Sequence, residues 1–557
     1  MNFSRNAQLN KLAEKRAGED RLFNFRPVLF FAIFLCLGIV VGGYILTGIS
    51  PLWLLVVLPV LSFPFFFCQS KAQVGRVLTV LCTLLLGFLV GVFSFTLQTD
   101  SFSQGVCEGE YFVRGRVVDC YETDNNFVVE LDSLRIGETK TRGKLVAYLP
   151  ISIGDSITLS DKVLIYGKVQ NTERVYEGKI NAYKIANNHR FRLDGEECSV
   201  VGSATNPFLF VRERIENAVR RGMDETPASV TLAVLLGDTS LIDEGLLENV
   251  RRGGIAHIFA VSGLHVGALY GFCLWLFKRE RLQKTPKWLQ FVLTFLLLVF
   301  YGGVCGYSSS VMRAIVMCLT LGAFNLLGLH RDLLESIGFA GIIVLLLSPA
   351  SLFTIGFQLS FVACIGIALF SRPISKGFAW IGDKISNLYY GKVELPEGMK
   401  EDSHPPSVAG RIWRACGSFL SVTISAQIFT APLQLYAFGY ISGWSVLLNC
   451  LFVPIVSVLF SVLLLFVVVA SICPLAFSVA ILYAPSVVWS TLLLVFEIAD
   501  FSSFAIEGIA LNFGAFVCSY GAFLFCTDKW NMKKGTRIFL IALLFVAFAI
   551  TVFALNR

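Results

Sequence analysis

Residues 27–46 read PVLFFAIFLCLGIVVGGYIL, an apolar run that contains no charged residue. A helix of about 20 such residues crosses the hydrocarbon core of a bilayer, which is roughly 30 Å thick. All Lys and Arg residues of the first 26 positions precede this run. Because the run is longer than the apolar core of a cleavable signal peptide, we expect a transmembrane helix that the protein retains.

The composition of the whole chain also indicates a protein that lies in a lipid bilayer. Of its 557 residues, 55% are hydrophobic and 15% are charged, and the mean hydropathy is +0.69. Soluble domains carry about 25% charged residues. The composition therefore excludes a water-soluble enzyme and predicts a polytopic α-helical membrane protein.

Similar apolar runs recur along the chain and predict further spans. With about 20 residues needed for each crossing, the sequence predicts about 13 spans, of which about one or two are re-entrant. The predicted spans are 28–49, 51–68, 77–98, 254–277, 288–304, 308–327, 334–349, 352–370, 415–438, 443–470, 476–497, 509–526 and 538–554.

The basic loops predict an orientation. Cytoplasmic loops are enriched in Lys and Arg, and the basic segments here are the N-terminal tail, the loop at 69–76, and residues 278–287, 371–414 and 529–537. With thirteen spans all of them lie on one side. We therefore expect a multi-pass protein of the cytoplasmic (inner) membrane, with a cytoplasmic N-terminus and with residues 100–206 outside.

Residues 100–206 have the pattern of a small β domain. Alternating segments at 111–121, 126–134, 144–149 and 162–170 are separated by turn signals. A five-stranded OB-like barrel, inserted after the third span, fits this length. The region holds 13 Lys and Arg against 16 Asp and Glu, so a structural or gating role and DNA binding both stay open. Cys107 and Cys198 flank the domain and are one candidate disulfide pair.

Residues 207–226, PFLFVRERIENAVRRGMDET, form an amphipathic stretch with apolar residues on one side and arginines on the other. Such a helix lies in the membrane interface, and a further role in guiding phosphate stays open. The expected organisation is a basic tail with three spans (1–99), the β domain (100–206), and a membrane domain of about ten transmembrane or re-entrant helices (207–557).

The most polar apolar-rich segment is 232–277, LAVLLGDTSLIDEGLLENVRRGGIAHIFAVSGLHVGALYGFCLWLF, called the motif segment below. Polar residues inside membrane helices are costly and usually functional. GDTSLID followed by RRGGIAHIFAVSGLHVGAL resembles the signature of the ComEC family of competence proteins. YGGVCGYSSSVMRAIVM (301–317), SPASLFTIGFQLSFVA (348–363) and APLQLYAFGYISGWSVLLNCLFVPI (431–455) resemble later blocks of that family. The resemblance covers roughly residues 27–530.

The resemblance implies a DNA channel that passes single-stranded DNA into the cytoplasm. Many members also carry a metallo-β-lactamase-like domain, which we expect this chain to lack. The positions that we expect along the DNA path are Arg251, Arg252, His257, Ser262, Gly263, His265, Arg313, Gln358 and Asn449. The motif positions that we expect to be structural are Gly237, Asp238, Gly253, Gly254, Ser308, Ser360, Pro432 and Pro454.

Structural alternatives remain for each candidate. Arg251 and Arg252 can snorkel to the interface, and Arg313 can do so or pair with Asp238 or Asp243. The amides of Gln358 and Asn449 can bond neighbouring helices, and the two histidines of the motif segment can do the same. For residues 251–266 we expect the mouth of the pore, with the arginine pair just outside a helix that starts at Gly253-Gly254.

No catalytic, metal or cofactor site is expected. The five histidines include no H-x-H-x-D-H cluster, C-x-x-C is absent, and no G-x-x-x-x-G-K-[ST] loop occurs. Moving a phosphate charge into an inside-negative cell costs about 2.3 kcal/mol per 100 mV. We therefore expect membrane lipid, a periplasmic or surface DNA-binding protein, a separate nuclease, and a cytoplasmic helicase-like ATPase with single-strand-binding proteins as partners.

Two other functions stay open. A small-solute secondary transporter would show inverted repeats, which the sequence lacks, and it leaves the outer domain unexplained. A membrane-embedded enzyme would use His257, His265 and Asp238. The eight residues between the histidines span about 12 Å along a helix, which is too far for one metal unless the helix breaks near Ser262-Gly263.

Overall fold

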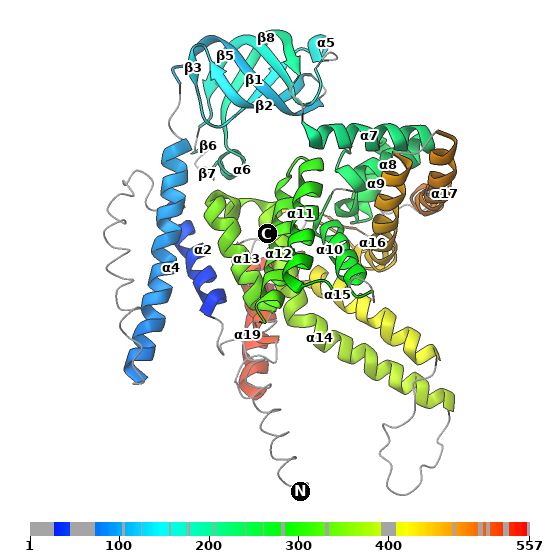
Figure 1. Ribbon diagram of the computed structural model, residues 1–557. Helices are drawn as coiled ribbons and strands as arrows, with labels where there is room; N and C mark the ends of the chain where they lie inside the picture. The colour runs from blue at the N-terminus through cyan, green and yellow to red at the C-terminus, as the bar shows by residue number, and fades with distance from the viewer. Residues whose placement is uncertain are drawn as a thin grey trace, which may run out of the picture.

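A set of membrane helices and a separate β-sheet domain at one end of them make up the described part of the chain (Figure 1). The structure is a computed structural model. It describes residues 27–44, 73–102, 106–123, 125–154, 157–173, 175–176, 179–203, 206–239, 241–259, 261–279, 284–328, 333–390, 408–471, 475–498, 505–507, 513–526 and 534–553. The basic N-terminal tail and the expected span 51–68 lie outside these residues.

Within these ranges, seven helices are long and apolar enough to cross a membrane, which makes the chain a multi-pass membrane protein. They are Leu81–Phe102, Lys287–Val304, Ser309–Leu326, Ile355–Lys384, Cys416–Phe438, Ser445–Ala470 and Phe477–Leu494. Shorter apolar helices occupy Pro27–Gly43, Glu225–Leu236, Gly263–Phe277, Leu333–Leu347, Gly514–Phe523 and Ile538–Phe548. The number of about thirteen spans therefore stays a prediction.

The first two described helices, α2 (Pro27–Tyr44) and α4 (Gln73–Phe102), form a closely packed pair. A Cβ atom at Gly38 would collide with the carbonyl of Phe88, and one at Gly91 would collide with the carbonyl of Leu35. Small residues let membrane helices approach to backbone contact. The glycines of the first apolar run thus serve helix packing.

The sheet domain follows α4. Its strands are β1 (Gly109–Glu122), β2 (Phe127–Ile136), β3 (Thr139–Lys140), β4 (Lys144–Leu149), β5 (Asp161–Asn171) and β8 (His189–Ser203). β1 pairs with β2 and β5, β5 with β8, β8 with β4 in parallel, and β4 with β2. The pairings therefore run around five strands and return to β1. Sequence alternation predicted β1, β2, β4 and β5, but it missed β8.

Alternate side chains of the strands form the core of this domain. In β5 the odd-numbered positions from Asp161 to Val169 are buried, while their neighbours are half-buried or exposed. Successive strand residues point to opposite faces, so one face of every strand contributes to a single apolar core. That core includes Val113, Val117, Leu131, Leu145, Val163, Ile165, Phe191 and Leu193. The small elements α5 (Ile151–Gly154), β6 (Val175–Tyr176), β7 (Lys179–Ile180) and α6 (Ala182–Ala186) complete the domain.

A hydrogen-bonded junction joins the sheet domain to the helices. The side chain of Gln98 on α4 donates to the carbonyl of Ile185 at 3.3 Å and accepts from the backbone N–H of Ala350 at 2.8 Å. The hydroxyl of Ser348 donates to the carbonyl of Ala186 at 3.2 Å. Three elements distant in sequence are thus held at one point, namely α4, α6 and the start of a 3-10 helix, η3 (Pro349–Phe353).

The remaining helices form the membrane part, with α7 lying across its upper end beneath the sheet domain (Figure 1). They are α7 (Pro207–Gly222), α8 (Glu225–Leu236), α9 (Glu244–Arg252), η2 (Ala256–Ile258), α10 (Gly263–Phe277), α11 (Lys287–Val304), α12 (Ser309–Leu326), α13 (Leu333–Leu347), α14 (Ile355–Tyr390), α15 (Val408–Phe438), α16 (Ser445–Ala470), α17 (Leu475–Ile498), α18 (Phe513–Cys526) and α19 (Lys534–Phe553). Two short strands, β9 (Tyr440–Ser442) and β10 (Ala505–Glu507), pair with each other.

One predicted loop is partly helical. Residues 371–414 were expected to be a basic loop, but α14 continues to Tyr390 and α15 begins at Val408. Polar residues end a membrane span without ending a helix, because water satisfies the outward side chains. The two helices form a hairpin that projects from the rest of the bundle (Figure 1).

Candidate functional site

The motif segment is a series of short, broken helices. It runs through α8, α9 and η2 before α10 begins. Residues 227–236 of α8 are all buried, and the hydroxyl of Tyr301 on α11 donates to the carbonyl of Leu235 at 2.8 Å. Irregular backbone at membrane depth is tolerated only where protein or a water-filled cavity surrounds it. α8 therefore lies inside the bundle, whereas most polar residues of α9 are exposed.

The Gly237-Asp238 turn joins the motif segment to the amphipathic helix. Gly237 ends α8 with a φ of +82°, a conformation that glycine adopts without strain. Arg212 of α7 contacts two carboxylates: its Nε lies 2.8 Å from Oε1 of Glu216, and its Nη2 lies 3.4 Å from Oδ2 of Asp238. Arg212 is thus engaged in ion pairs. Sequence reasoning placed it on the polar face but missed both partners, although the i,i+4 spacing to Glu216 was a signal.

The arginine pair ends a helix instead of preceding one. Arg251 and Arg252 are the last residues of α9, and Gly253 is its C-cap. Their side chains are 62% and 46% exposed, and both approach Glu248, at 4.0 and 3.0 Å respectively. The expectation of a helix that starts at Gly253-Gly254 is therefore wrong.

Gly254 explains why the chain breaks at this point. Its φ is +75°, and a Cβ there would lie 2.5 Å from the Cβ of Ser445 on α16. A left-handed residue cannot continue a right-handed helix. The chain therefore turns after α9, passes through η2, and starts α10 only at Gly263.

Ser262 and His265 form a local cap at the start of α10. The backbone N–H of Ser262 donates to Nδ1 of His265 at 3.0 Å, and the hydroxyl of Ser262 accepts from the N–H of Leu264 at 3.3 Å. Because Nδ1 accepts, a neutral ring carries its proton on Nε2. The His265 side chain is buried against Phe460, with ring centroids 4.9 Å apart. His257 lies in η2 and is exposed.

Arg313 joins α12 to α14 from a buried position. Its side chain is 6% exposed and donates to the hydroxyl of Ser309 at 2.7 Å, to the carbonyl of Gly356 at 3.1 Å, and to the hydroxyl of Ser360 at 3.2 Å. Asp238 instead contacts Arg212, and Asp243 caps α9 by accepting from the N–H of Leu246. Of the alternatives left open for Arg313, the structure thus shows neither aspartate as its partner.

The other motif residues occupy helix ends and bends. Gln358 donates to the carbonyl of Leu352 at 3.0 Å, which ties α14 to η3. Asn449 is 3% exposed in α16, and Ser308 is the N-cap of α12. Pro432 lies within α15 and Pro454 within α16.

The structure brings part of the predicted path together. A Cβ on Gly263 would lie 3.8 Å from the Cβ of Ala314, so the start of α10 borders the turn of α12 that carries Arg313. Through Arg313 this contact extends to Ser360 on α14. The arginine pair of α9 lies on a different surface, beside Tyr440, whose hydroxyl donates to the carbonyl of Arg252 at 2.7 Å.

Among the residues that the structure describes, no three His, Cys, Asp or Glu residues gather as metal ligands. Cys107 and Cys198 are both free. β1 meets β5 at Gly109 opposite Val169, and β8 meets the other edge of β5 at Cys198 opposite Ile165. Four residues of strand measure about 13 Å, and a disulfide needs Cα atoms within about 7 Å. The two cysteines therefore do not pair.

One buried ionic group lies in the sheet domain. Oε2 of Glu130 lies 3.2 Å from Nε2 of His189 and 3.5 Å from Nζ of Lys144. Burial alone would raise the pKa of Glu130, but the hydrogen bond from His189 and the charges of both neighbours outweigh it and lower the pKa. The nearby Asp119 has a raised pKa because of burial and the charge of Glu130.

Comparisons with known proteins agree on one family. A family model described as "Competence protein" matches residues 234–533, which include the motif segment from Val234 onward. ComE operon protein 3 of Bacillus subtilis (strain 168) is 25% identical over 259 residues, or 46% of this chain and 28% of that protein. Uncharacterized protein MG316 of Mycoplasma genitalium is 26% identical over 212 residues, or 38% of this chain and 44% of that protein.

A third relative, the uncharacterized MG316 homolog of Mycoplasma pneumoniae, is 30% identical over 121 residues, or 21% of this chain and 30% of that protein. The chain thus aligns with less than half of the length of each of these curated relatives. No solved structure matches the chain.

Proposed function

Because the chain belongs to the competence protein family, we propose that it carries single-stranded DNA across the cytoplasmic membrane into the cell. This family is the one that the motif segment resembles, so that resemblance is confirmed. Membership and the relation to ComE operon protein 3 support a role in DNA uptake for competence. The single-stranded cargo and its direction are our proposal.

The observation that carries the proposal is the broken motif segment. Two short helices and one 3-10 turn precede α10, and their apolar residues share one core with α7, α10, α11 and α16, while the polar side of α9 is exposed. Membrane proteins keep such irregular backbone where a polar substrate passes or binds. Arg313 and Ser360 border the start of α10 and supply further polar groups at that place.

DNA phosphates need a positively charged entry. Arg251 and Arg252 are exposed at the end of α9 and outnumber the single Glu248 that they contact. Guanidinium groups bind phosphate with charge-assisted hydrogen bonds. We propose that this pair meets the strand first and that Ser262, Gly263 and Arg313 line the path beyond it.

The outer domain and the orientation belong to the same proposal. The ring of five paired strands with a single parallel pair supports an OB-like barrel, which is a five-stranded Greek-key architecture. The basic loops support a cytoplasmic N-terminus and an extracytoplasmic sheet domain. In a cysteine-reduced variant, Lys140→Cys should react with an impermeant thiol reagent from outside, and Ile385→Cys should not. Outside labelling of position 385 would overturn this orientation.

We also propose that the chain acts as a channel and not as a nuclease or ATPase. A bare pore does not import phosphates against an inside-negative potential, at a cost of about 2.3 kcal/mol per charge and 100 mV. A cytoplasmic helicase-like ATPase would pull the strand, a separate nuclease would remove the other strand, and an outer DNA-binding protein would deliver the duplex. DNA cleavage that requires divalent cations and co-purifies with the chain would contradict the proposal that the chain is not a nuclease.

The test is a deletion followed by labelled DNA in competent cells. Without the chain, DNA should still reach the cell surface but should not enter the cytoplasm, and re-expression should restore entry. If the deletion strain accumulates label inside the cytoplasm at the normal rate, the proposal is wrong. If surface DNA is lost as well, the chain acts in capture instead of translocation.

A further inference from the structure

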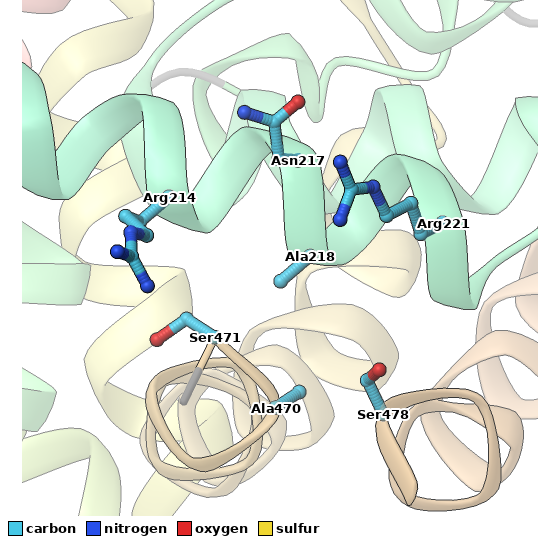
Figure 2. A pocket seen from close by; sticks show the side chains of 7 residues that line it. All are labelled: Arg214, Asn217, Ala218, Arg221, Ala470, Ser471 and Ser478. Carbon is cyan, nitrogen blue, oxygen red and sulfur yellow. The ribbon is translucent and has the colours of Figure 1, made fainter. Parts of the chain in front are cut away.

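A small cavity lies beneath α7, where α16 ends and α17 begins (Figure 2). It measures about 310 Å³. Four of its lining residues share one stripe of α7 and the other three come from the ends of the two spans. The lining residues are Arg214, Asn217, Ala218, Arg221, Ala470, Ser471 and Ser478. We call it the α7 pocket.

The α7 pocket has the charge of an anion site. Arg214 and Arg221 are two turns apart on the same face of α7, with the amide of Asn217 between them (Figure 2). Neither arginine forms an ion pair within the described part of the chain, and no acidic residue lines the pocket. The acidic Glu216 of the same helix is already bound by Arg212. Two positive charges thus face one cavity without a counter-charge.

The position of the pocket along the membrane normal selects the kind of anion. The span in α16 ends at Ala470 and the next span begins at Phe477, so the pocket lies at the boundary between hydrocarbon and headgroups. α7 itself is amphipathic and crosses the ends of the spans (Figure 1). A helix of this kind lies in the interface plane. Phosphate groups of lipids are found at this depth.

The two helices whose ends line the pocket, α16 and α17, also carry exposed apolar side chains. Leu465 on α16 is 53% exposed, and Phe477 and Tyr483 on α17 are 65% and 68% exposed. A lipid tail covers such surfaces, whereas a DNA strand needs positive groups for its phosphates. The surroundings of the pocket therefore match an amphipathic ligand with one anionic end.

We propose that the α7 pocket binds an anionic phospholipid, with its phosphate on Arg214 and Arg221 and its acyl chains along α16 and α17. Such a lipid would fasten α7, which connects the sheet domain to the bundle, to the two spans below it. The proposal rests on the pocket and on its place at the ends of two membrane spans, and it does not depend on DNA transport.

The test measures lipid retention on the purified full-length chain. Native mass spectrometry compares phosphatidylglycerol and cardiolipin with phosphatidylcholine, and a separate arm measures binding of a single-stranded oligonucleotide. Arg221→Gln removes one positive charge from the pocket, and the double variant Arg214→Gln with Arg221→Gln removes both. Arg220→Gln is the matched control, because this neighbouring residue is exposed on the same helix and does not line the pocket.

Wild type and Arg220→Gln should retain the anionic lipids in preference to phosphatidylcholine. Arg221→Gln should weaken retention about tenfold, the effect of losing one charge-assisted hydrogen bond, and the double variant more. Arg221→Lys, which keeps the charge, should retain most of the binding and shows that loss in Arg221→Gln does not come from misfolding. Unchanged retention in the double variant, or equal loss in Arg220→Gln, would overturn the proposal. Loss of oligonucleotide binding with unchanged lipid retention would also overturn it and assign the pocket to DNA.

Discussion

Arg212 of α7 and Asp238 of the motif segment contact each other, with Nη2 and Oδ2 3.4 Å apart. The contact joins the helix beneath the sheet domain to the turn where α8 ends. Since Arg212 also holds Glu216, one guanidinium fixes the start of the broken segment relative to the interface helix. The first of the two aspartates of the GDTSLID motif thus has a structural partner outside the motif.

Replacing Asp238 should loosen this turn. Asp238→Asn keeps the shape but removes the charge, and we expect a loss of about 1 kcal/mol in stability, as for a partly exposed ion pair. Thermal unfolding of the purified chain measures the change. Asp224→Asn removes the same charge from an exposed N-cap whose side chain makes no capping hydrogen bond, and it should have no effect. Equal unfolding temperatures for Asp238→Asn and wild type would show that the ion pair contributes nothing.

Gly254 should not tolerate a side chain. Gly254→Ala must adopt a φ near +75° and place its Cβ against Ser445, so we expect a loss of more than about 1 kcal/mol. Gly267→Ala is the matched control in α10, where a Cβ meets nothing within 4 Å and a helical Ala is favoured by about 1 kcal/mol over Gly. Thermal unfolding should therefore separate the two variants in opposite directions. A harmless Gly254→Ala would mean that the chain does not turn there.

Arg313 is a buried charge without an acidic partner among the described residues. Arg313→Met leaves the hydroxyls of Ser309 and Ser360 and the carbonyl of Gly356 without this donor, so we expect a loss of about 1–3 kcal/mol in stability. If the charge serves DNA, import should fall on the order of tenfold, as for one lost phosphate contact. Ser309→Ala keeps the charge and should import normally. A lowered unfolding temperature with normal import per folded molecule would make Arg313 a structural residue only.

The ionic group in the sheet domain predicts a pH dependence. The pKa of Glu130 is lowered in the folded chain from its usual 4.5, so the ionised group stabilises the domain above that value and loses its effect as the pH falls through the lowered pKa. Glu130→Gln should cost about 1–3 kcal/mol near pH 7, and the difference from wild type should shrink at a pH well below 4.5. Unfolding measured at both pH values checks this, with the exposed Glu196→Gln as the control. A difference that grows on acidification would reverse the sign that we expect.

The sequence predicted those helices and strands that are set by the pattern of apolar residues within the segment itself. Seven apolar runs became long helices because a chain in lipid must satisfy its own backbone, and alternation gave four strands of the sheet domain. β8 was missed because its alternation is interrupted at Gly195, where β5 and β8 have a register shift next to Gly167. The helix expected at 254–277 begins only at Gly263, because the chain turns at Gly254, which α16 approaches closely.

In the candidate site, too, contacts between residues close in sequence could be anticipated, and contacts between distant helices could not. The cap between Ser262 and His265 spans three residues, and the sequence singled out both as polar residues of an apolar segment but placed them within a helix that begins earlier. The partners of Arg313 and Asp238 come from α14 and α7, which are distant in the chain. Only the packing of the helices decides such pairs, so the sequence offered several partners and could not choose among them.

The most direct test of translocation is the entry of labelled DNA in cells that carry Arg251→Glu with Arg252→Glu. The matched control is Arg251→Lys with Arg252→Lys, which keeps both positive charges at these exposed positions. At equal protein abundance, the Glu variant should bind DNA at the cell surface normally and admit less than about one tenth of it, because like charges repel the phosphates. The Lys variant should admit DNA at close to the normal rate. Normal entry in the Glu variant would contradict the account.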